Sequence, residues 1–389
     1  MEYKPLGSMV NRKIGYGIVQ PGQSVPDGVP VIKVNNLISG LKSPSELDTT
    51  ARENEAKYSR TRLHGGELIV SVVGTIGKTA IVPKSFAGCN LVRATALIDI
   101  EDELMSKWVK YYFDSPCGQS YIEQNLNTTV QPTLNIKSLV EMPIPIRDTT
   151  EMEKNVLLLS ALDEKIEVNR QINDNLYAQA KAIFDNHFIN IDAIPAGWRK
   201  GNLLDIANYL NGLAMQKFRP QGNEIGLPVL KIKELRQGSC DDSSELCSLR
   251  IKPEYIIHDG DVIFSWSGSL LVDIWCGGTC GLNQHLFKVT SDIYDKWFYY
   301  LWTAHHLARF IAIAADKATT MGHIKREELA KAEVLIPCEE DYTSLTSIMQ
   351  PIFELIISNR IEARKLAALR DELLPKLMSG EIDVSDVQC

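Results

Sequence analysis

The residues from Gly74 to Thr79 have the types that could bind a nucleotide phosphate. Their order, Gly-Thr-Ile-Gly-Lys-Thr, imitates the end of a phosphate-binding loop. The full G-x-x-x-x-G-K-[ST] motif needs a glycine at position 72, where this chain has Val72. We therefore interpret the segment as a tight turn between strands, whose Lys78 could reach a phosphate of DNA. Nucleotide chemistry at Gly77-Lys78 is the least supported alternative.

Histidine and cysteine positions do not predict a metal site. His305-His306 lie in a predicted helix without a carboxylate at metal-ligand spacing. The eight cysteines are scattered, and the pair Cys276 and Cys280 has no second pair. An Asn/Asp-Pro-Pro-Tyr/Phe segment, expected of an adenine methyltransferase, is absent from the sequence. We expect reduced thiols, no bound metal and no catalysis by this chain itself.

A second set of side chains has the chemistry of nucleic-acid recognition. Lysine, arginine and hydroxyl groups hold phosphates, whereas Arg or Lys reads guanine and Asn or Gln reads adenine. His285 could contact a base or equally serve as a buried hydrogen-bonding residue. The predicted DNA-binding residues are Lys33, Asn35, Asn36, Arg60, Arg62, Lys78, Arg93, Thr128, Thr129, Gln131, Lys231, Lys233, Asn283, Gln284, His285, Thr319, Thr320 and Lys325.

Composition limits the classes of protein. The chain has 389 residues, of which 44% are hydrophobic and 23% charged, as in an ordinary soluble globular protein. Its formal net charge of -8 argues against a surface that is basic throughout, although a local basic patch is enough to bind DNA. No apolar run approaches the roughly 18 residues of a membrane span, and the N-terminus lacks a signal-peptide core. We expect a cytoplasmic protein.

The whole chain is an internal duplication. The segment from Val29 to Leu37 matches that from Leu227 to Leu235, and an aromatic-rich helix begins at both Trp108 and Trp297. Two long amphipathic stretches, 151–188 and 342–378, repeat each other 190 positions apart. The sequence therefore predicts the order domain, long helix, domain, long helix.

The two long stretches have the apolar spacing of a coiled-coil seam, on which Asn169 and Asn359 lie. Roughly 33 helical residues make a rod of about 50 Å, which suits a spacer. Thr150 and Asp341 are predicted N-caps, and Gly380 is the predicted end of the second helix.

We predict an α+β fold with a pseudo-two-fold internal repeat, in which two β-rich mixed domains are joined by two long antiparallel coiled-coil helices. The predicted segments are domain 1 at 1–150, the central spacer helix at 151–190, domain 2 at 191–340, and the C-terminal helix and tail at 341–389. Similar domains about such an axis suit the two strands of a duplex. Because the domains differ in sequence, a bipartite DNA site with unlike halves is the expected ligand.

These features together resemble the specificity subunits of type I restriction-modification systems. The resemblance covers essentially the whole chain. It includes the short sequence motifs Gly15-Tyr-Gly-Ile-Val-Gln-Pro-Gly22, Ile194-Pro-Ala-Gly-Trp198 and Leu282-Asn-Gln-His-Leu-Phe287. It implies a non-catalytic chain with two target-recognition domains, which selects an asymmetric bipartite site. The Asn-Gln-His signature of domain 2 is matched in domain 1 only by Asn90-Leu-Val.

The resemblance also implies partners. Two methyltransferase (modification) subunits and, through them, restriction or translocase subunits are expected, with S-adenosylmethionine, ATP and Mg in those partners. We predict that outward apolar residues of the helices bind the methyltransferases, although packing on the chain's own domains is an alternative. These are Tyr177, Phe184, Phe188, Ile348, Leu355 and Leu369. A coiled-coil scaffold that presents two domains to proteins or sugars remains the alternative function.

Overall fold

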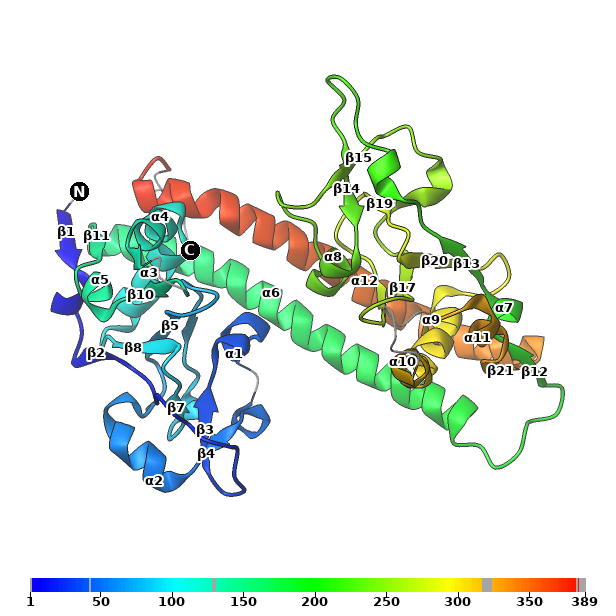
Figure 1. The fold of residues 1–389 in the computed structure, drawn as a ribbon, viewed down its shortest axis with the longest axis horizontal. Helices are drawn as coiled ribbons and strands as arrows, with labels where there is room; N and C mark the ends of the chain where they lie inside the picture. Colours follow the sequence, from blue (N-terminus) through cyan, green and yellow to red (C-terminus); the bar gives the residue numbers. More distant parts are fainter. Residues whose placement is uncertain (1, 42, 128–130, 317–323, 383, 385–389) are drawn as a thin grey trace. The chain divides into compact units, whose positions relative to one another are not determined.

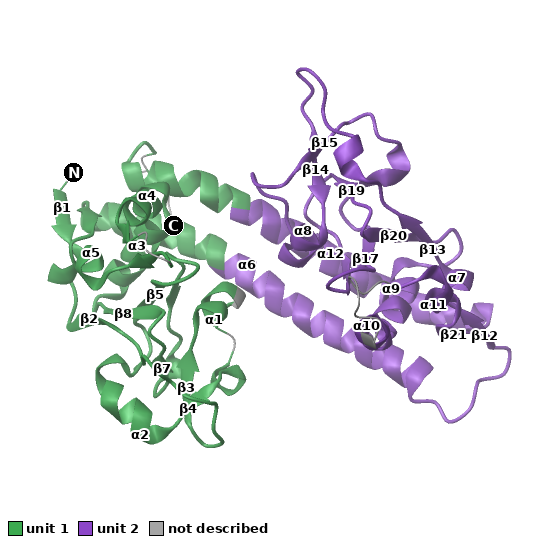
Figure 2. Ribbon diagram, in the orientation of Figure 1, with its two compact units in different colours: residues 1–163, 368–389 green, residues 164–367 purple. Residues whose placement is uncertain are grey.

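The computed structural model describes residues 2–41, 43–127, 131–316, 324–382 and 384 (Figure 1). The chain forms two compact units, which are coloured separately in Figure 2. Unit 1 comprises residues 1–163 and 368–389, and unit 2 comprises residues 164–367. The division cuts both long helices, so each unit combines a globular part with a segment of each helix. No helix in the described ranges is long and apolar enough to cross a membrane.

Unit 1 is built on an antiparallel four-stranded sheet of order β2-β8-β5-β6. A smaller sheet, β4-β3-β7, contains the parallel pair β3 and β7. Strands β1 with β11 and β9 with β10 form two further pairs. The strands are β1 Glu2–Pro5, β2 Arg12–Tyr16, β3 Val29–Ile32, β4 Thr49–Thr50, β5 Leu68–Ser71, β6 Thr79–Ile81, β7 Asn90–Leu91, β8 Thr95–Asp99, β9 Leu126–Asn127, β10 Thr133–Leu134 and β11 Pro143–Ile146. The short helices are α1 Val34–Ser39, α2 Arg52–Glu55, α3 Glu103–Asp114, α4 Pro116–Gln124 and α5 Ile136–Val140.

Unit 2 repeats this plan. Its main sheet has the order β13-β20-β17-β18, its second sheet the order β15-β14-β19-β16, and β12 pairs with β21. The strands are β12 Arg199–Asn202, β13 Asn208–Asn211, β14 Leu227–Leu230, β15 Leu246–Cys247, β16 Ile256–Ile257, β17 Val262–Ser265, β18 Leu271–Ile274, β19 Cys280–Leu282, β20 Leu286–Thr290 and β21 Glu333–Ile336. The short helices are α7 Leu203–Ile206, α8 Ile232–Gln237, α9 Lys296–His305, α10 Leu307–Asp316 and α11 Arg326–Ala330. The predicted duplication of a β-rich mixed domain is confirmed.

The central strands β5 and β17 bury every side chain. Successive residues of a strand point to opposite faces of its sheet. In unit 1, Leu68 and Val70 lie in one core cluster and Ile69 in another, and in unit 2 Val262 and Ile263 divide in the same way. Each main sheet is therefore covered on both faces, which explains why these strands read as continuous apolar runs.

The long helices are α6, Thr149–Phe184, and α12, Glu339–Ser379, and a single π turn, Asp185–Ile189, follows α6. Gly380, at φ 78°, ends α12 as predicted. The predicted N-caps were wrong. Asp148 caps α6 because its carboxylate accepts a hydrogen bond from the Thr150 amide at 3.0 Å. Asp341 lies in the first turn of α12, where its carboxylate accepts a hydrogen bond from the Trp198 indole at 2.6 Å.

The helix segments pair antiparallel within each unit, as predicted. In unit 1, Arg370 of α12 donates to Asp163 of α6 at 2.8 Å, amid buried apolar residues of both helices. In unit 2 the seam is more polar. Asn169 donates to Glu362 at 2.6 Å, and Asn359 donates to the side-chain oxygen of Asn173 at 3.0 Å.

Two of the predicted docking residues lie in the core of unit 2. Phe184 is 2% exposed and Phe188 is 3% exposed, and both rings pack on Trp302. The prediction that they present an outward apolar surface was wrong, because the end of α6 packs against α9 (Figure 1). Packing on the chain's own domain, the alternative for these residues, is confirmed.

Candidate nucleic-acid interface

A pocket of about 580 Å³ in unit 2 brings together five of the predicted DNA-binding residues. They come from the junction of β14 with α8 and from the loop between β19 and β20. The turn of the β17–β18 hairpin supplies a third wall. The lining residues are Gln216, Arg219, Lys231, Ile232, Lys233, Glu245, Ser267, Gly268, Asn283, Gln284 and His285.

Backbone hydrogen bonds to neighbouring segments hold the β19–β20 loop in place. The Asn283 amide donates to the Leu230 carbonyl at 3.2 Å, and the Gln284 amide donates to the Leu213 carbonyl at 2.8 Å. A side chain at Gly212 would place its Cβ 2.2 Å from the Asn283 carbonyl oxygen, so only glycine fits. The loop therefore presents the side chains of residues 283–285 from a fixed backbone.

The charges of the pocket are partly balanced. Glu245 accepts from both Lys231 and Arg219, and these contacts hold the pKa of its carboxyl below the usual value. Lys233 donates to the Ser243 hydroxyl at 2.7 Å, and its ammonium lies 3.6 Å from Asp241. All three cations remain at least one third exposed. With three cations to the single carboxylate of Glu245, the pocket lining is positive within an acidic chain.

His285 is hydrogen-bonded within the protein, and its contact with a base stays a prediction. Its ring nitrogen Nδ1 lies 3.0 Å from the Ser267 hydroxyl, and Gln284 Nε2 lies 3.4 Å from its Nε2. The ring is half-buried at the pocket wall. The imidazole is hydrogen-bonded within the protein and still lines the pocket.

Unit 1 has the same construction with different side chains. At the start of α1 the Asn36 side chain accepts a hydrogen bond from the Lys33 amide at 2.8 Å, and the Lys33 ammonium lies 2.6 Å from Asp48. Asn35 is exposed on the first turn of this helix. Lys78 is exposed at the β5–β6 turn, where Gly77 has φ 81°. The turn leads into a strand, as interpreted from the sequence, whereas a phosphate-binding loop leads into a helix.

The equivalence of the two loops differs from the one that the sequence suggested. Val31 pairs with Asn90 in β3–β7, and Val229 pairs with Gly281 in β14–β19. Asn90 therefore corresponds to Gly281, not to Asn283. It is fully buried and bonds to Thr61 and Glu55.

The remaining predicted residues of unit 1 are dispersed. Arg62 forms two hydrogen bonds with the buried Glu55, at 2.8 and 2.5 Å, so its guanidinium already has a structural partner. Arg60, Arg93 and Gln131 are exposed. Thr128, Thr129, Thr319 and Thr320 lie outside the described residues. In unit 2, Lys325 is exposed next to Ile324, whose amide donates to the Trp266 carbonyl of the hairpin turn.

Sequence reasoning missed four polar residues of the unit 2 pocket. Gln216 lies in a short 3-10 helix, Met215–Lys217, and Arg219 follows it, Glu245 precedes β15, and Ser267 lies in the hairpin turn. The chemistry of Arg219 was a usable signal, but nothing in its sequence neighbourhood placed it near Lys231.

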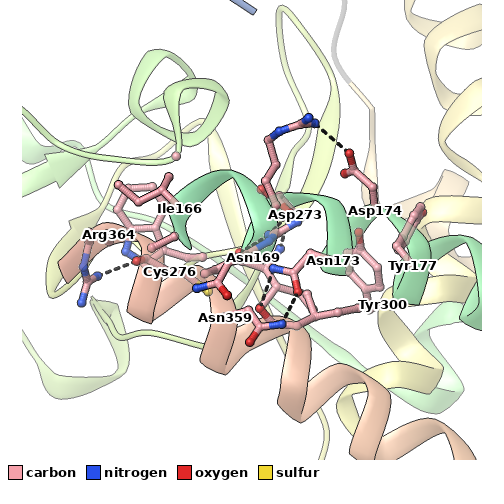
Figure 3. A pocket seen from close by; sticks show the side chains of 17 residues that line it. Ile166, Asn169, Asn173, Asp174, Tyr177, Asp273, Cys276, Tyr300, Asn359 and Arg364 are labelled. Atoms are coloured by element: carbon pink, nitrogen blue, oxygen red, sulfur yellow. Dashed lines mark hydrogen bonds and ion pairs between the residues drawn. The ribbon is translucent and has the colours of Figure 1, made fainter. Parts of the chain in front are cut away.

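A second cavity, of about 540 Å³, lies in unit 2 between α6, α12 and β18 (Figure 3). Its arginines are neutralised: Arg170 by Asp174, Arg360 by Asp273 and Arg364 by Asp259. None of the predicted DNA-binding residues lines it. We interpret it as the junction that holds the domain on the helices.

The histidines at the end of α9 have structural surroundings. No cluster of three or more potential metal ligands occurs among the described residues. His306 is largely buried and hydrogen-bonded to the Glu333 carbonyl at 2.8 Å, and burial lowers the pKa of both His305 and His306.

Four predicted docking residues are exposed on the helices. Their exposed fractions are 36% for Tyr177, 49% for Ile348, 46% for Leu355 and 44% for Leu369. Docking at these four residues stays a prediction.

Comparison with known proteins identifies the family. The model of the type I restriction modification DNA specificity domain matches residues 2–178 and 195–369. The chain is 26% identical over 312 residues to the type I restriction enzyme MjaIX specificity subunit of Methanocaldococcus jannaschii, covering 74% of this chain and 71% of that one. It is 29% identical over 177 residues to the EcoBI specificity subunit of Escherichia coli, covering 44% and 37%. The crystal structure of a type I S subunit from M. genitalium has the same fold, with a TM-score of 0.54, 15% identity, and coverage of 96% of this chain and 95% of that one. This chain, with two tandem matches that span most of its length, belongs to the family of type I restriction-modification specificity subunits.

Proposed function

We propose that this chain selects an asymmetric bipartite DNA sequence on behalf of a type I restriction-modification complex, and that it is not itself a catalyst. The observation that carries the proposal is one loop construction built twice from different polar residues. Both units have a lysine at the strand end, Lys33 and Lys231, but unit 1 then offers Asn35 and Arg93 where unit 2 offers Lys233 and Gln284. Because the two loops share a backbone conformation but carry different hydrogen-bonding side chains, they favour two half-sites of different sequence.

The remaining charge distribution supports local contact with DNA. A net charge of -8 disfavours binding through the whole surface, whereas exposed lysines at the strand ends can each neutralise a phosphate. Lys33 and Lys231 already have acidic partners, which would hold the ammonium groups in place before DNA arrives.

The long helices are proposed to hold two methyltransferase subunits and, through them, restriction or translocase subunits. S-adenosylmethionine, ATP and Mg would then be bound by those partners. Leu355 and Leu369 are exposed apolar residues of α12, and a Leu355→Asp, Leu369→Asp variant should lose methyltransferase in a pull-down while its circular dichroism stays native. Retention of the methyltransferase by this folded variant argues against docking there.

The function is tested by co-expressing the chain with the methyltransferase encoded beside its gene and mapping methylated adenines by long-read sequencing. One bipartite motif with a gap of unread base pairs is expected. Absence of methylation from a folded, assembled complex contradicts the proposal and favours the alternative, a scaffold that presents two domains to protein or sugar ligands. A gel shift with the complex, on DNA with and without the motif, gives an independent readout.

A further inference from the structure

Arg93 and Gln284 occupy the same place in the two units. The Arg93 amide donates to the Ile18 carbonyl at 2.8 Å, and the Gln284 amide donates to the Leu213 carbonyl at 2.8 Å. The preceding residues match as well, because Val92 bonds to the Ile32 carbonyl and Asn283 to the Leu230 carbonyl, both at 3.2 Å. Both loops lead from the parallel strand pair into the main sheet. The backbone therefore presents the two side chains in the same way.

These two side chains differ from their charged neighbours in having little to bind within the chain. Arg93 is exposed, and its guanidinium makes no hydrogen bond or ion pair with another described residue. The Gln284 side chain lines the pocket of unit 2, and its hydrogen-bonding contact among the described residues is the 3.4 Å approach of its Nε2 to His285. By contrast, the cations of Lys33, Arg62 and Lys231 are all engaged by carboxylates.

A guanidinium and a carboxamide have distinct partners in the major groove. Arginine donates two hydrogen bonds to guanine O6 and N7, whereas glutamine donates to adenine N7 and accepts from its N6. We infer that Arg93 reads a guanine in one half-site and Gln284 reads an adenine at the equivalent position of the other. This assignment rests on the proposed function and names the residues and bases that make the half-sites differ.

The neighbouring position strengthens the assignment for unit 2. His285 corresponds to Ala94 in unit 1, and its ring is held by Ser267 at 3.0 Å. A ring at this position limits the rotamers of the adjacent Gln284 amide, which suits bidentate reading of one base. Arginine has a longer, planar fork and needs no such support to bind guanine.

The test exchanges the two side chains in separate variants. Arg93→Gln and Gln284→Arg are each co-expressed with the methyltransferase, and the methylated motif is mapped. Arg93→Gln should change or relax one guanine position of one half-site, and Gln284→Arg one adenine position of the other. Discrimination against the original wrong base should fall about 10-fold or more, as for loss of a bidentate base contact. The other half-site and the gap should stay unchanged.

Two matched control variants make the same change of charge at positions outside the two loops. Arg52→Gln in unit 1 and Gln221→Arg in unit 2 replace exposed residues outside the pocket, and both should leave the motif as in the wild type. Circular dichroism and the thermal midpoint report whether each variant is folded.

An unchanged motif in both folded loop variants overturns the inference, even if total methylation falls. Equal relaxation of several positions in both half-sites also overturns it, since that outcome indicates a structural role. If the wild-type complex itself yields no bipartite motif, the proposed function has failed first, so the two failures are distinguishable. Gel shifts with single-base substitutions in the duplex provide the same comparison for a variant with weak methylation.

Discussion

Replacing Arg364 with alanine should weaken the attachment of the β17–β18 hairpin of unit 2 to α12. The Arg364 guanidinium binds both carboxylate oxygens of Asp259, at 2.7 and 2.8 Å, and the Cys276 carbonyl at 2.5 Å. Among the described residues, removing it leaves Asp259 with a hydrogen bond from the Gly278 amide, at 2.8 Å. The two side chains are 31% and 25% exposed, between a surface pair and a buried pair.

The magnitude follows from that intermediate burial. Exposed ion pairs contribute about 0.2–1 kcal/mol, and removing one partner of a buried pair costs about 3–5 kcal/mol. With solvent screening at this exposure, we expect Arg364→Ala to lower the free energy of unfolding of unit 2 by about 2 kcal/mol. Arg364→Lys keeps the charge but not the two-pronged geometry, so roughly half of that loss is expected.

Tryptophan fluorescence during urea unfolding is the appropriate assay. Of the six tryptophans, only Trp108 lies in unit 1, so the signal reports mainly on unit 2. Arg170→Ala is the matched control, because the partners of Arg170 among the described residues are Glu167 and Asp174 of its own helix, α6. That variant should lose about 0.5 kcal/mol or less. Equal losses in Arg364→Ala and Arg170→Ala would refute the reasoning.

Three further predictions concern other buried polar groups. Asn169 is 1% exposed, its Oδ1 has no partner among the described residues, and its amide donates to Glu362, a half-exposed carboxylate that Lys165 also contacts. Asn169→Leu should therefore raise the free energy of unfolding by about 1 kcal/mol, whereas Asn173→Leu, which breaks two hydrogen bonds, should lower it. Arg62→Ala should lower the urea midpoint, because it leaves the buried carboxylate of Glu55 without its ion-pair partner and with the Asn90 amide as a donor, while Arg60→Ala should leave the midpoint unchanged. Burial raises the pKa of Asp163, but Lys110 and Arg370 outweigh it and hold that pKa below its usual value. Its stabilising contribution is therefore complete above the unfolded pKa of about 3.9 and is lost as pH falls through the lower folded value, so the stability difference from Asp163→Asn should shrink in acid unfolding scans.

The sequence predicted those features that depend on local periodicity or on repetition. The duplicated order of domains and helices, the antiparallel pairing and the turn at Gly74–Lys78 were all readable, because each is encoded within one short segment or in its copy. Phe184 and Phe188 were misassigned because apolar spacing does not reveal which of two apolar faces meets the chain's own domain. Long-range contacts explain the rest. The match of Asn90 to Gly281 depends on strand pairing, and the approach of Arg219 to Lys231 depends on loop geometry.

The β17–β18 hairpin connects the Arg364 contact to the candidate DNA pocket. Its root, at Asp259 and residues 275–278, is held by α12, and its turn supplies Ser267 and Gly268 to the pocket. Strands of four residues at about 3.3 Å each separate these ends by roughly 13 Å. A change at the root should therefore alter the placement of the pocket wall without removing a contact to DNA.

This separation predicts a distinct binding signature for Arg364→Ala. The ratio of specific to non-specific affinity should fall, while the slope of log affinity against log salt stays as in the wild-type complex, because no phosphate contact is lost. Lys78→Ala should do the reverse, since an exposed lysine on a phosphate changes the slope by about 0.9 and carries no sequence information. Gel shifts at several salt concentrations measure both quantities. A wild-type specificity ratio for folded Arg364→Ala would show that the hairpin does not transmit position from helix to pocket.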